Sequence, residues 1–308
     1  MDFDLDDRQR TLLATVDAVV TDSGRERAYA VSAQGGYDGD LDRSLYAALA
    51  GRALNLLDRV LVADRLAELG CATTTGLALA LDAARTDTAA DTGGGVTVVG
   101  PTGLARFGAD AETAVVESDG GVRAVRLGSS AGQPVRSGFG FPYARIERAR
   151  LGAAPVVCVL DPARWPEVIV LIRSAELAGA AAAAVARTGE HLRGRHQFGQ
   201  PLANFQALRH RLAEAAVSAD ATRWLVREAA YTRAPRDIAI AAQYAQQTAA
   251  TLVPELVQLG GARSFAREFG LHVNPMRLEA LRLELGRPDR LAAAVNTAPL
   301  AAGVGNGR

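Results

Sequence analysis

The stretch LRGRHQFGQPLANFQALRHRLAE, Leu192 to Glu214, decides how the rest of the chain is interpreted. Its first part brings together a guanidinium, an amide, an aromatic ring and a glycine, in the order Arg195, Gln197, Phe198 and Gly199. Its second part has apolar residues at helical spacing. A planar, permanently charged side chain next to a glycine suits a site where a flat, anionic molecule approaches the backbone closely. The stretch therefore predicts a ligand-contacting turn that leads into a long helix.

Length and composition are those of an ordinary globular protein. The 308 residues are 49% hydrophobic, enough for one large or two to three small domains. The 34 basic residues balance 34 acidic ones, so no net field attracts nucleic acid or an anionic membrane. The opening MDFDLDDRQR is acidic where a signal peptide is basic, and no uninterrupted apolar run reaches the roughly 18 residues of a membrane helix. We therefore expect a cytoplasmic protein without nucleic-acid or membrane partners.

Cysteine and histidine usage argues against a metal site. Cys71 and Cys158 lie far apart in the sequence, so neither a disulfide framework nor a zinc cluster can be built from them, and we expect both to be buried. The histidines do not form a pair four residues apart, which makes metal ligation improbable. They are His191, His196, His210 and His272.

Three segments differ in their apolar pattern, and together they predict an α+β fold. Residues 1–88 show helical spacing broken by the Gly/Asp-rich SAQGGYDGD, which indicates an N-terminal helical domain. Residues 89–160 contain short β-rich runs such as GVTVVG and PVVCVL, which predict a small antiparallel sheet in a middle β-domain. Residues 161–308 predict a C-terminal helical bundle. Its helices are expected from Asp161, followed by Pro162, to about Gly194, from Phe205 to Thr232, from Pro235 to about Leu259, and after His272.

Two motifs of this bundle resemble the acyl-CoA dehydrogenase family. The segment RHQFGQPLANFQALRHRLAE resembles, without a gap, that family's flavin-binding helix, R-x-Q-F-G-x-P-L-x-x-F-Q. A second segment, QLGGARSFAREFGLH, is similar to the family's Q-L-H-G-G-x-G-F-T-x-E-x-x-L-H. The helix–sheet–helix order is also that of the family, so the resemblance extends over most of the chain. The matching positions of the second segment are Gln258, Gly261, Phe265, Glu268 and His272.

The resemblance implies FAD as the cofactor. In the family, these two segments hold the ADP half of an FAD that sits mainly in the neighbouring subunit's site, so binding across a subunit interface is implied. Arg195 suits a pyrophosphate, because its fork is planar and permanently charged. Gln206 and Gln258 offer amide groups to an adenine or ribitol edge. The full set that the resemblance assigns to the cofactor is Arg195, Gln197, Phe198, Gln206, Gln258 and Gly261.

The catalytic half of the family's site is missing from this sequence. Family members hold the flavin ring with a T-E-P-x-x-G-S-D segment and a later W-x-T strand, and this sequence has neither. Their catalytic glutamate removes the α-proton of an acyl-CoA while hydride leaves the β-carbon for the flavin. Counting from the motifs places Leu285 or Ile169 at the positions where that glutamate is expected. The motif arginine expected near Met276 is also absent, and Ala262 replaces the second glycine.

Glu284 is the catalytic candidate that remains, one residue before the vacant position. Because one residue turns a helical side chain by about 100°, we expect Glu284 to point elsewhere and to be an exposed charge on the final helix. Glu167 and Glu176 are weaker candidates.

We interpret the chain as one subunit of an oxidoreductase of lipid metabolism. It resembles the shortened non-catalytic subunit of heteromeric, α2β2 actinobacterial acyl-CoA dehydrogenases, which implies α,β-dehydrogenation of an acyl-CoA thioester, such as a steroid side-chain CoA, together with a homologous catalytic subunit. Two alternatives stay open. The chain is a self-sufficient homomeric dehydrogenase with a relocated base such as Glu284, or it is a flavin-free structural partner in which Arg195 forms an interface ion pair.

Overall fold

Four N-terminal helices, of which the last two pack against the long C-terminal helices, begin the computed structural model, which describes residues 4–24, 36–87, 95–118, 121–128, 132–266 and 269–299. Capping boxes at Asp6 and Asn55 begin the first and third of these helices. The third approaches the bundle so closely that a Cβ added at Gly179 would lie 2.0 Å from the Asp64 carbonyl oxygen. The helices are α1 (Asp7–Asp22), α3 (Gly39–Leu49), α4 (Leu56–Glu68) and α5 (Thr75–Ala84).

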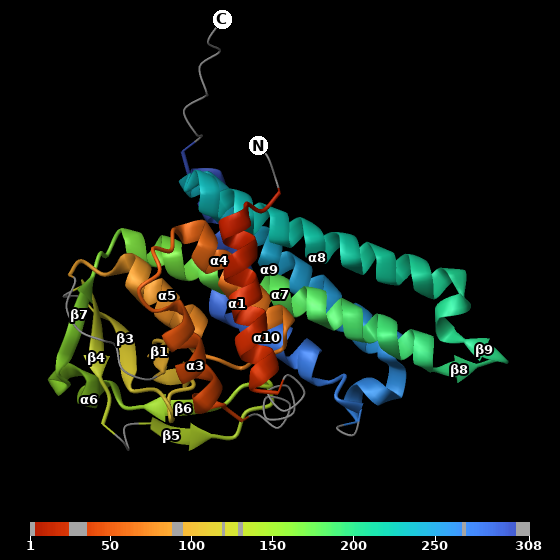
Figure 1. Cartoon of the computed structure of the whole chain (residues 1–308), viewed down its shortest axis with the longest axis horizontal. Helices are drawn as coiled ribbons and strands as arrows, with labels where there is room; N and C mark the ends of the chain where they lie inside the picture. The colour runs from red at the N-terminus through yellow and green to blue at the C-terminus, as the bar shows by residue number, and fades with distance from the viewer. Residues whose placement is uncertain are drawn as a thin grey trace, which may run out of the picture.

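The middle segment forms two small sheets at one end of the molecule (Figure 1). One sheet has the order β1-β3-β4-β7 and the other the order β2-β6-β5. The prediction of an antiparallel sheet is wrong for one pair, since β1 and β3 run parallel. The chain passes from β1 through β2, in the other sheet, before it returns as β3. The bounds are β1 (Val96–Val98), β2 (Leu104–Arg106), β3 (Thr113–Ser118), β4 (Gly121–Arg126), β5 (Gly132–Val135), β6 (Tyr143–Ile146), α6 (Arg148–Ala153) and β7 (Val156–Leu160).

The C-terminal segment is the predicted helical bundle. The first helix begins at Arg164 rather than at Pro162, but the Asp161 carboxylate still accepts hydrogen bonds from the N–H groups of Ala163 and Arg164 and so caps the helix from outside. A final short helix was not predicted separately, and Gly286, with φ 104°, divides it from the helix before. The bounds are α7 (Arg164–Gly194), α8 (Gln206–Thr232), α9 (Pro235–Gly260), α10 (Val273–Leu285) and α11 (Pro288–Thr297).

Helix α7 is the centre of the fold, because α4, α5, α8, α9 and α10 all pack against it. Among the described residues, α7 is the one helix long and apolar enough to cross a membrane, but 83% of its most apolar window is buried inside the protein. That burial is what a core helix requires. Cys71 and Cys158 are both buried, as predicted.

Candidate functional site

The Arg195 segment forms a tight hairpin at the end of the bundle farthest from the sheets (Figure 1). Its two turn residues, Phe198 and Gly199, have φ values of 55° and 81°. Two successive positive φ values are typical of the two-residue turns that match the twist of the flanking strands. The hairpin strands are β8 (His196–Gln197) and β9 (Gln200–Pro201), and the 3-10 turn η1 (Leu202–Asn204) leads from them into α8.

Phe198 is an unusual residue for such a turn. A positive φ favours Gly, Asn or Asp, because a larger side chain crowds the backbone in the left-handed region. Its side chain is nevertheless 88% exposed and meets only the edge of Phe205 among described aromatic rings, at 6.0 Å between centroids. The strained backbone costs free energy, and an apolar ring exposed to solvent does not repay that cost in the folded chain. Such an outlier indicates a contact with another molecule.

The second motif is exposed as well. Gln258 lies in the last turn of α9, and Gly261 begins the 3-10 turn η2 (Gly261–Phe265) with φ 57°. Nothing lies within 4 Å of the position that a Cβ on Gly261 would take, so the backbone there is open to an approaching ligand. Phe265 is 76% exposed. The motif residue Glu268 lies outside the described residues.

Positive charges from both motifs act on the same imidazole. Burial lowers the pKa of His191, in the last turn of α7, and the positive charges of Arg263 and Arg195 lower it further. Both guanidiniums therefore lie near this imidazole. Within the described ranges neither arginine has a carboxylate partner, and Arg263 instead stacks on the Phe269 ring at 4.3 Å. We call two half-buried arginines, Arg195 and Arg263, together with the exposed residues Phe198, Gln258, Gly261 and Phe265, the motif surface.

The motif surface fits the ADP half of FAD in its chemistry. It offers permanent positive charge to a pyrophosphate, and amide groups and an aromatic face to flat, polar rings. Gln197 is less available, because its amide donates to the neighbouring His196 carbonyl at 2.7 Å, and Gln206 lies 3.5 Å from His210 at the start of α8. Most of these residues are exposed to solvent. The motif surface therefore suits a ligand that is enclosed between this chain and a second protein surface.

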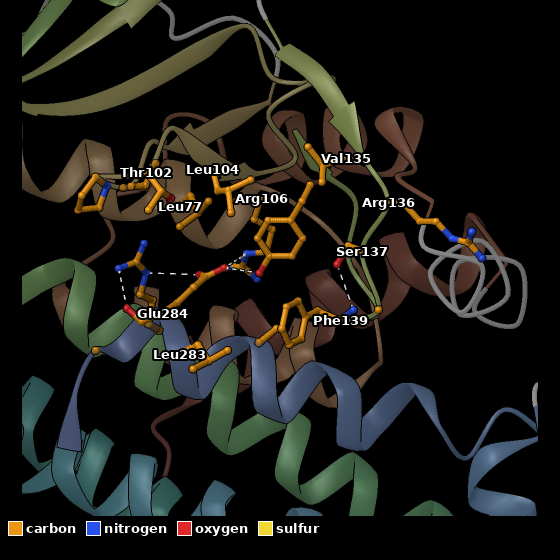
Figure 2. A pocket seen from close by; sticks show the side chains of 18 residues that line it. Leu77, Thr102, Leu104, Arg106, Val135, Arg136, Ser137, Phe139, Leu283 and Glu284 are labelled. Carbon is orange, nitrogen blue, oxygen red and sulfur yellow. Dashed lines mark hydrogen bonds and ion pairs between the residues drawn. The ribbon is translucent and has the colours of Figure 1, made fainter. Parts of the chain in front are cut away.

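A cavity of about 570 Å³ lies elsewhere, between the β-strands and helices α7 and α10 (Figure 2). Its walls are mainly apolar and its floor is polar. The apolar lining includes Leu77, Val98, Leu104, Val135, Phe139 and Leu283, and the polar lining includes Arg106, Arg136, Ser137, Tyr143, Arg173 and Glu284.

Glu284 faces this cavity, so the prediction of an exposed surface charge is wrong. Its side chain is 17% exposed, and its Oε1 accepts a hydrogen bond from the Tyr143 hydroxyl at 2.9 Å. Leu285, at the vacant glutamate position, is instead buried in the core. The last turn of α10 packs Leu285 inward, and the 100° step then turns Glu284 toward the cavity.

Two arginines hold Glu284 from either side. The Nε of Arg106 lies 3.3 Å from its Oε1, and the Nε of Arg173 lies 3.5 Å from its Oε2. Arg106 also donates to Glu176 at 2.6 Å, and its guanidinium lies 4.8 Å from the Phe141 ring centroid. Burial raises the pKa of Glu176, and the positive charge of Arg106 opposes that rise. Arg106, Arg173, Glu176 and Glu284 thus form one network of two positive and two negative groups, of which Glu176 lies outside the cavity lining.

No pattern in the sequence indicates most of this network. Arg106 and Tyr143 lie in separate β-rich runs and Arg173 in an apolar helix, with no spacing that marks them as a group. Glu176, a weaker catalytic candidate, is the ion-pair partner of Arg106, whereas Glu167 does not line the cavity. No group of three or more His, Cys, Asp or Glu residues that could hold a metal occurs in the described part of the chain.

Comparison with known proteins identifies the fold of this chain. The family model "Acyl-CoA dehydrogenase, C-terminal domain" matches residues 171–287. The ChsE4–ChsE5 complex from Mycobacterium tuberculosis aligns with a TM-score of 0.73 and 19% identity, over 97% of this chain and 100% of that one. The chain has the acyl-CoA dehydrogenase fold. The predicted fold class is thereby confirmed.

Two further relatives are informative. The acyl-CoA dehydrogenase IpdE2 of Mycobacterium tuberculosis is 32% identical over 132 residues, which are 43% of this chain and 41% of the relative. The match thus spans about two fifths of that relative's length. The Tcur3481–Tcur3483 steroid acyl-CoA dehydrogenase, in a G363A variant, aligns with a TM-score of 0.70 and 18% identity over 94% of this chain and 96% of that one. At that identity the structural likeness shows the fold alone.

Proposed function

We propose that this chain is one subunit of an FAD-dependent acyl-CoA dehydrogenase and supplies the ADP-binding half of the FAD site to a homologous catalytic subunit. The observation that carries the proposal is the position of the motif surface. It is positively charged and partly exposed at one end of the bundle, and the sheets lie at the other end (Figure 1). The 570 Å³ cavity is lined by residues of those sheets and of α7 and α10, and by none of the motif surface. A ligand held by this surface must be completed by another chain.

Each residue of the motif surface has a distinct role in this proposal. Arg195 binds the pyrophosphate through charge-assisted hydrogen bonds, because within the described residues no acid competes for it. Phe198 packs its exposed ring against the ligand or the partner, and Gly261 lets the ligand approach the backbone. Bound FAD would accept the hydride that leaves the β-carbon of an acyl thioester, and in this proposal the catalytic base belongs to the partner.

We extend the proposal to the assembly and the substrate class. Two structural neighbours, ChsE4–ChsE5 and the Tcur3481–Tcur3483 steroid enzyme, combine differently named subunits, which supports an α2β2 heteromer with a homologous partner. The latter name also supports a steroid side-chain CoA thioester as the substrate. A cytoplasmic location remains part of the proposal.

A self-sufficient homomeric dehydrogenase is the second candidate function. It is favoured by one observation, the carboxylate of Glu284 at the cavity rather than on the surface. Tyr143, Arg106 and Arg173 all contact this carboxylate, however, and a general base must have a free lone pair directed at its proton. We therefore rank this candidate below the heteromer.

Flavin counting of the assembled complex tests the proposal. The chain is co-expressed with a homologous catalytic subunit, and flavin absorbance is compared with protein concentration. We expect two FAD molecules per α2β2 tetramer, because only the partner can enclose the flavin ring. Four flavins per tetramer would contradict this reading, yellow and active protein from this chain alone would favour the homomer, and a colourless complex would favour the flavin-free partner.

Arg195→Ala tests the motif surface itself. Loss of one charge-assisted contact, about 1.5 to 3 kcal/mol, should weaken FAD retention roughly ten- to hundredfold, and added FAD should restore much of the rate. The matched control is Arg290→Ala, which removes an exposed arginine from α11. An Arg195→Ala complex that keeps its flavin through dialysis would contradict the proposal.

A further inference from the structure

A second cavity, of about 390 Å³, lies among the two small sheets and shares no lining residue with the 570 Å³ cavity. It is enclosed by the ends of β4 and β6, by α6 and by the residues that lead from α6 into β7 (Figure 1). Its inner wall is formed by Leu127, Ile146 and Leu151, each at most 8% exposed and each part of an apolar cluster to which both sheets contribute. The cavity therefore reaches from the surface into the core of the sheets.

The space exists because small residues line it. Gly128, Ala153 and Ala154 are part of the lining, and a Cβ added at Gly128 would meet nothing within 4 Å. The Arg126 N–H donates to the Pro155 carbonyl at 2.8 Å, so a backbone hydrogen bond fixes the wall where β4 meets the start of β7. Protein cores are close-packed, and small-molecule sites have volumes of about 300–1,000 Å³. An open space of this size beside buried apolar side chains is therefore typical of a ligand site.

Two arginines give this cavity its charge. Arg126 and Arg150 line it, and within the described part of the chain no acidic residue does. The Nη1 of Arg126 lies 3.7 Å from the Oε2 of Glu112, and the Nε of Arg150 lies 3.0 Å from the Oε2 of Glu147. All four side chains are between 40% and 59% exposed, and ion pairs as exposed as these contribute little stability. A ligand anion can therefore bind both guanidiniums at small cost.

The two glutamates limit how much negative charge such a ligand can carry. Each lies close to one of the arginines but outside the cavity lining, so the four side chains together have no net charge. A dianion held by the arginines would be repelled by both carboxylates, because like charges close together oppose each other. A single negative charge is the better match.

We propose that this cavity binds a monocarboxylate with a straight apolar chain. The chain of the ligand covers Leu127, Ile146 and Leu151, and its carboxylate accepts charge-assisted hydrogen bonds from Arg126 and Arg150. The site shares no residue with the motif surface, so it goes beyond the proposed function. Flavin counting and carboxylate binding are separate measurements, and either proposal can fail while the other stands.

Isothermal titration calorimetry with decanoate tests the proposal on the full chain, alone or in complex with a homologous catalytic subunit. Saturable binding is expected. Ala153→Trp fills the opening of the cavity and should weaken decanoate binding at least about tenfold, because the indole takes the place of the ligand chain. Ala213→Trp is the matched control, since Ala213 is also an exposed helical alanine but lies on α8, and it should change binding less than about twofold.

Leu283→Trp distinguishes the two cavities. Leu283 lines the 570 Å³ cavity, so this substitution should leave decanoate binding unchanged. Circular dichroism and thermal melting establish that each variant folds. If Ala153→Trp does not fold, Gly128→Trp replaces it with the same expected result, because a side chain there begins in open space. No saturable binding at millimolar decanoate, equal binding by Ala153→Trp and Ala213→Trp, or loss of binding in Leu283→Trp alone would overturn the proposal.

The charge of the ligand is tested with the double substitution Arg126→Ala and Arg150→Ala. It should weaken decanoate binding about tenfold but leave decanol within about twofold, because decanol has no charge for the guanidiniums to bind. Arg287→Ala is the matched control, since Arg287 is an exposed arginine that also pairs with a nearby acid, Asp289, at 2.9 Å.

Ligands of other charge complete the test. Decanoate should bind more tightly than decanol, and decanol more tightly than decylammonium. Equal loss of decanoate and decanol in the double variant, or decylammonium bound as tightly as decanoate, would overturn the anionic class. Decyl phosphate bound more tightly than decanoate at pH values where it is a dianion would overturn the monocarboxylate and make the cavity a phosphate site.

Discussion

Phe198→Asn should make the chain more stable and its FAD retention weaker. Phe198 has φ 55° in a two-residue turn, a position where Asn is among the preferred residues. The left-handed conformation costs a residue of this size about 1 to 2 kcal/mol, and asparagine adopts it more readily. Against this gain stands the loss of the edge-on contact with Phe205, about 0.5 kcal/mol for a pair in which Phe198 is almost fully exposed. The net expectation is a free energy of unfolding higher by about 0.5 kcal/mol.

The same substitution should weaken FAD retention, although it stabilises the chain. Because the ring is 88% exposed in this chain, any burial it achieves occurs in the assembled FAD site. Burying half or more of a phenylalanine side chain is worth about 1.4 kcal/mol, which corresponds to roughly tenfold weaker FAD retention when the ring is lost. Urea denaturation of the purified variant measures stability, and loss of flavin absorbance on dialysis of the complex measures retention.

Phe198→Leu is the control, because leucine removes the aromatic ring but keeps an apolar side chain at the same positive φ. It should weaken FAD retention without raising stability, so the two variants should differ in stability by about 1 kcal/mol. An Asn variant less stable than the unaltered chain by 1 kcal/mol or more would show that the ring stabilises this chain itself. Unchanged FAD retention would show that Phe198 makes no contact in the site.

Three further outcomes are expected. Burial lowers the pKa of His191, and the charges of Arg263 and Arg195 lower it further; a bound pyrophosphate should offset those charges and raise this pKa, which NMR titration of the imidazole with and without ADP should show. ADP affinity should therefore increase as the pH falls from the pKa of His191 in the ADP complex to its lower pKa in the unliganded chain, and this pH dependence should disappear in His191→Gln. Glu284→Gln should leave turnover of the assembled complex within about threefold, whereas loss of a true general base costs on the order of a hundredfold; a collapse with FAD still bound would make Glu284 the base.

The sequence by itself determined the elements of the fold and the two motifs. The helices at α7 to α10 follow from apolar residues repeated at helical spacing, a property of neighbouring residues that needs no tertiary information. The Asp161 cap and the start of α9 at Pro235 follow from local backbone chemistry in the same way. The motifs around Arg195 and Gln258 were recognisable because their residues are close together in the chain.

Only the tertiary structure decided what surrounds each of these elements. Arg106, Tyr143, Arg173 and Glu284 are brought together from β2, β6, α7 and α10, and no local pattern records which strand end faces which helix. The same holds for Arg263, whose charge acts on the His191 imidazole together with that of Arg195, although the two arginines are far apart in the sequence. The direction of Glu284 was the clearest failure. A helix fixes the 100° between Glu284 and Leu285, but packing of the whole helix decides which of the two meets the core and which the cavity.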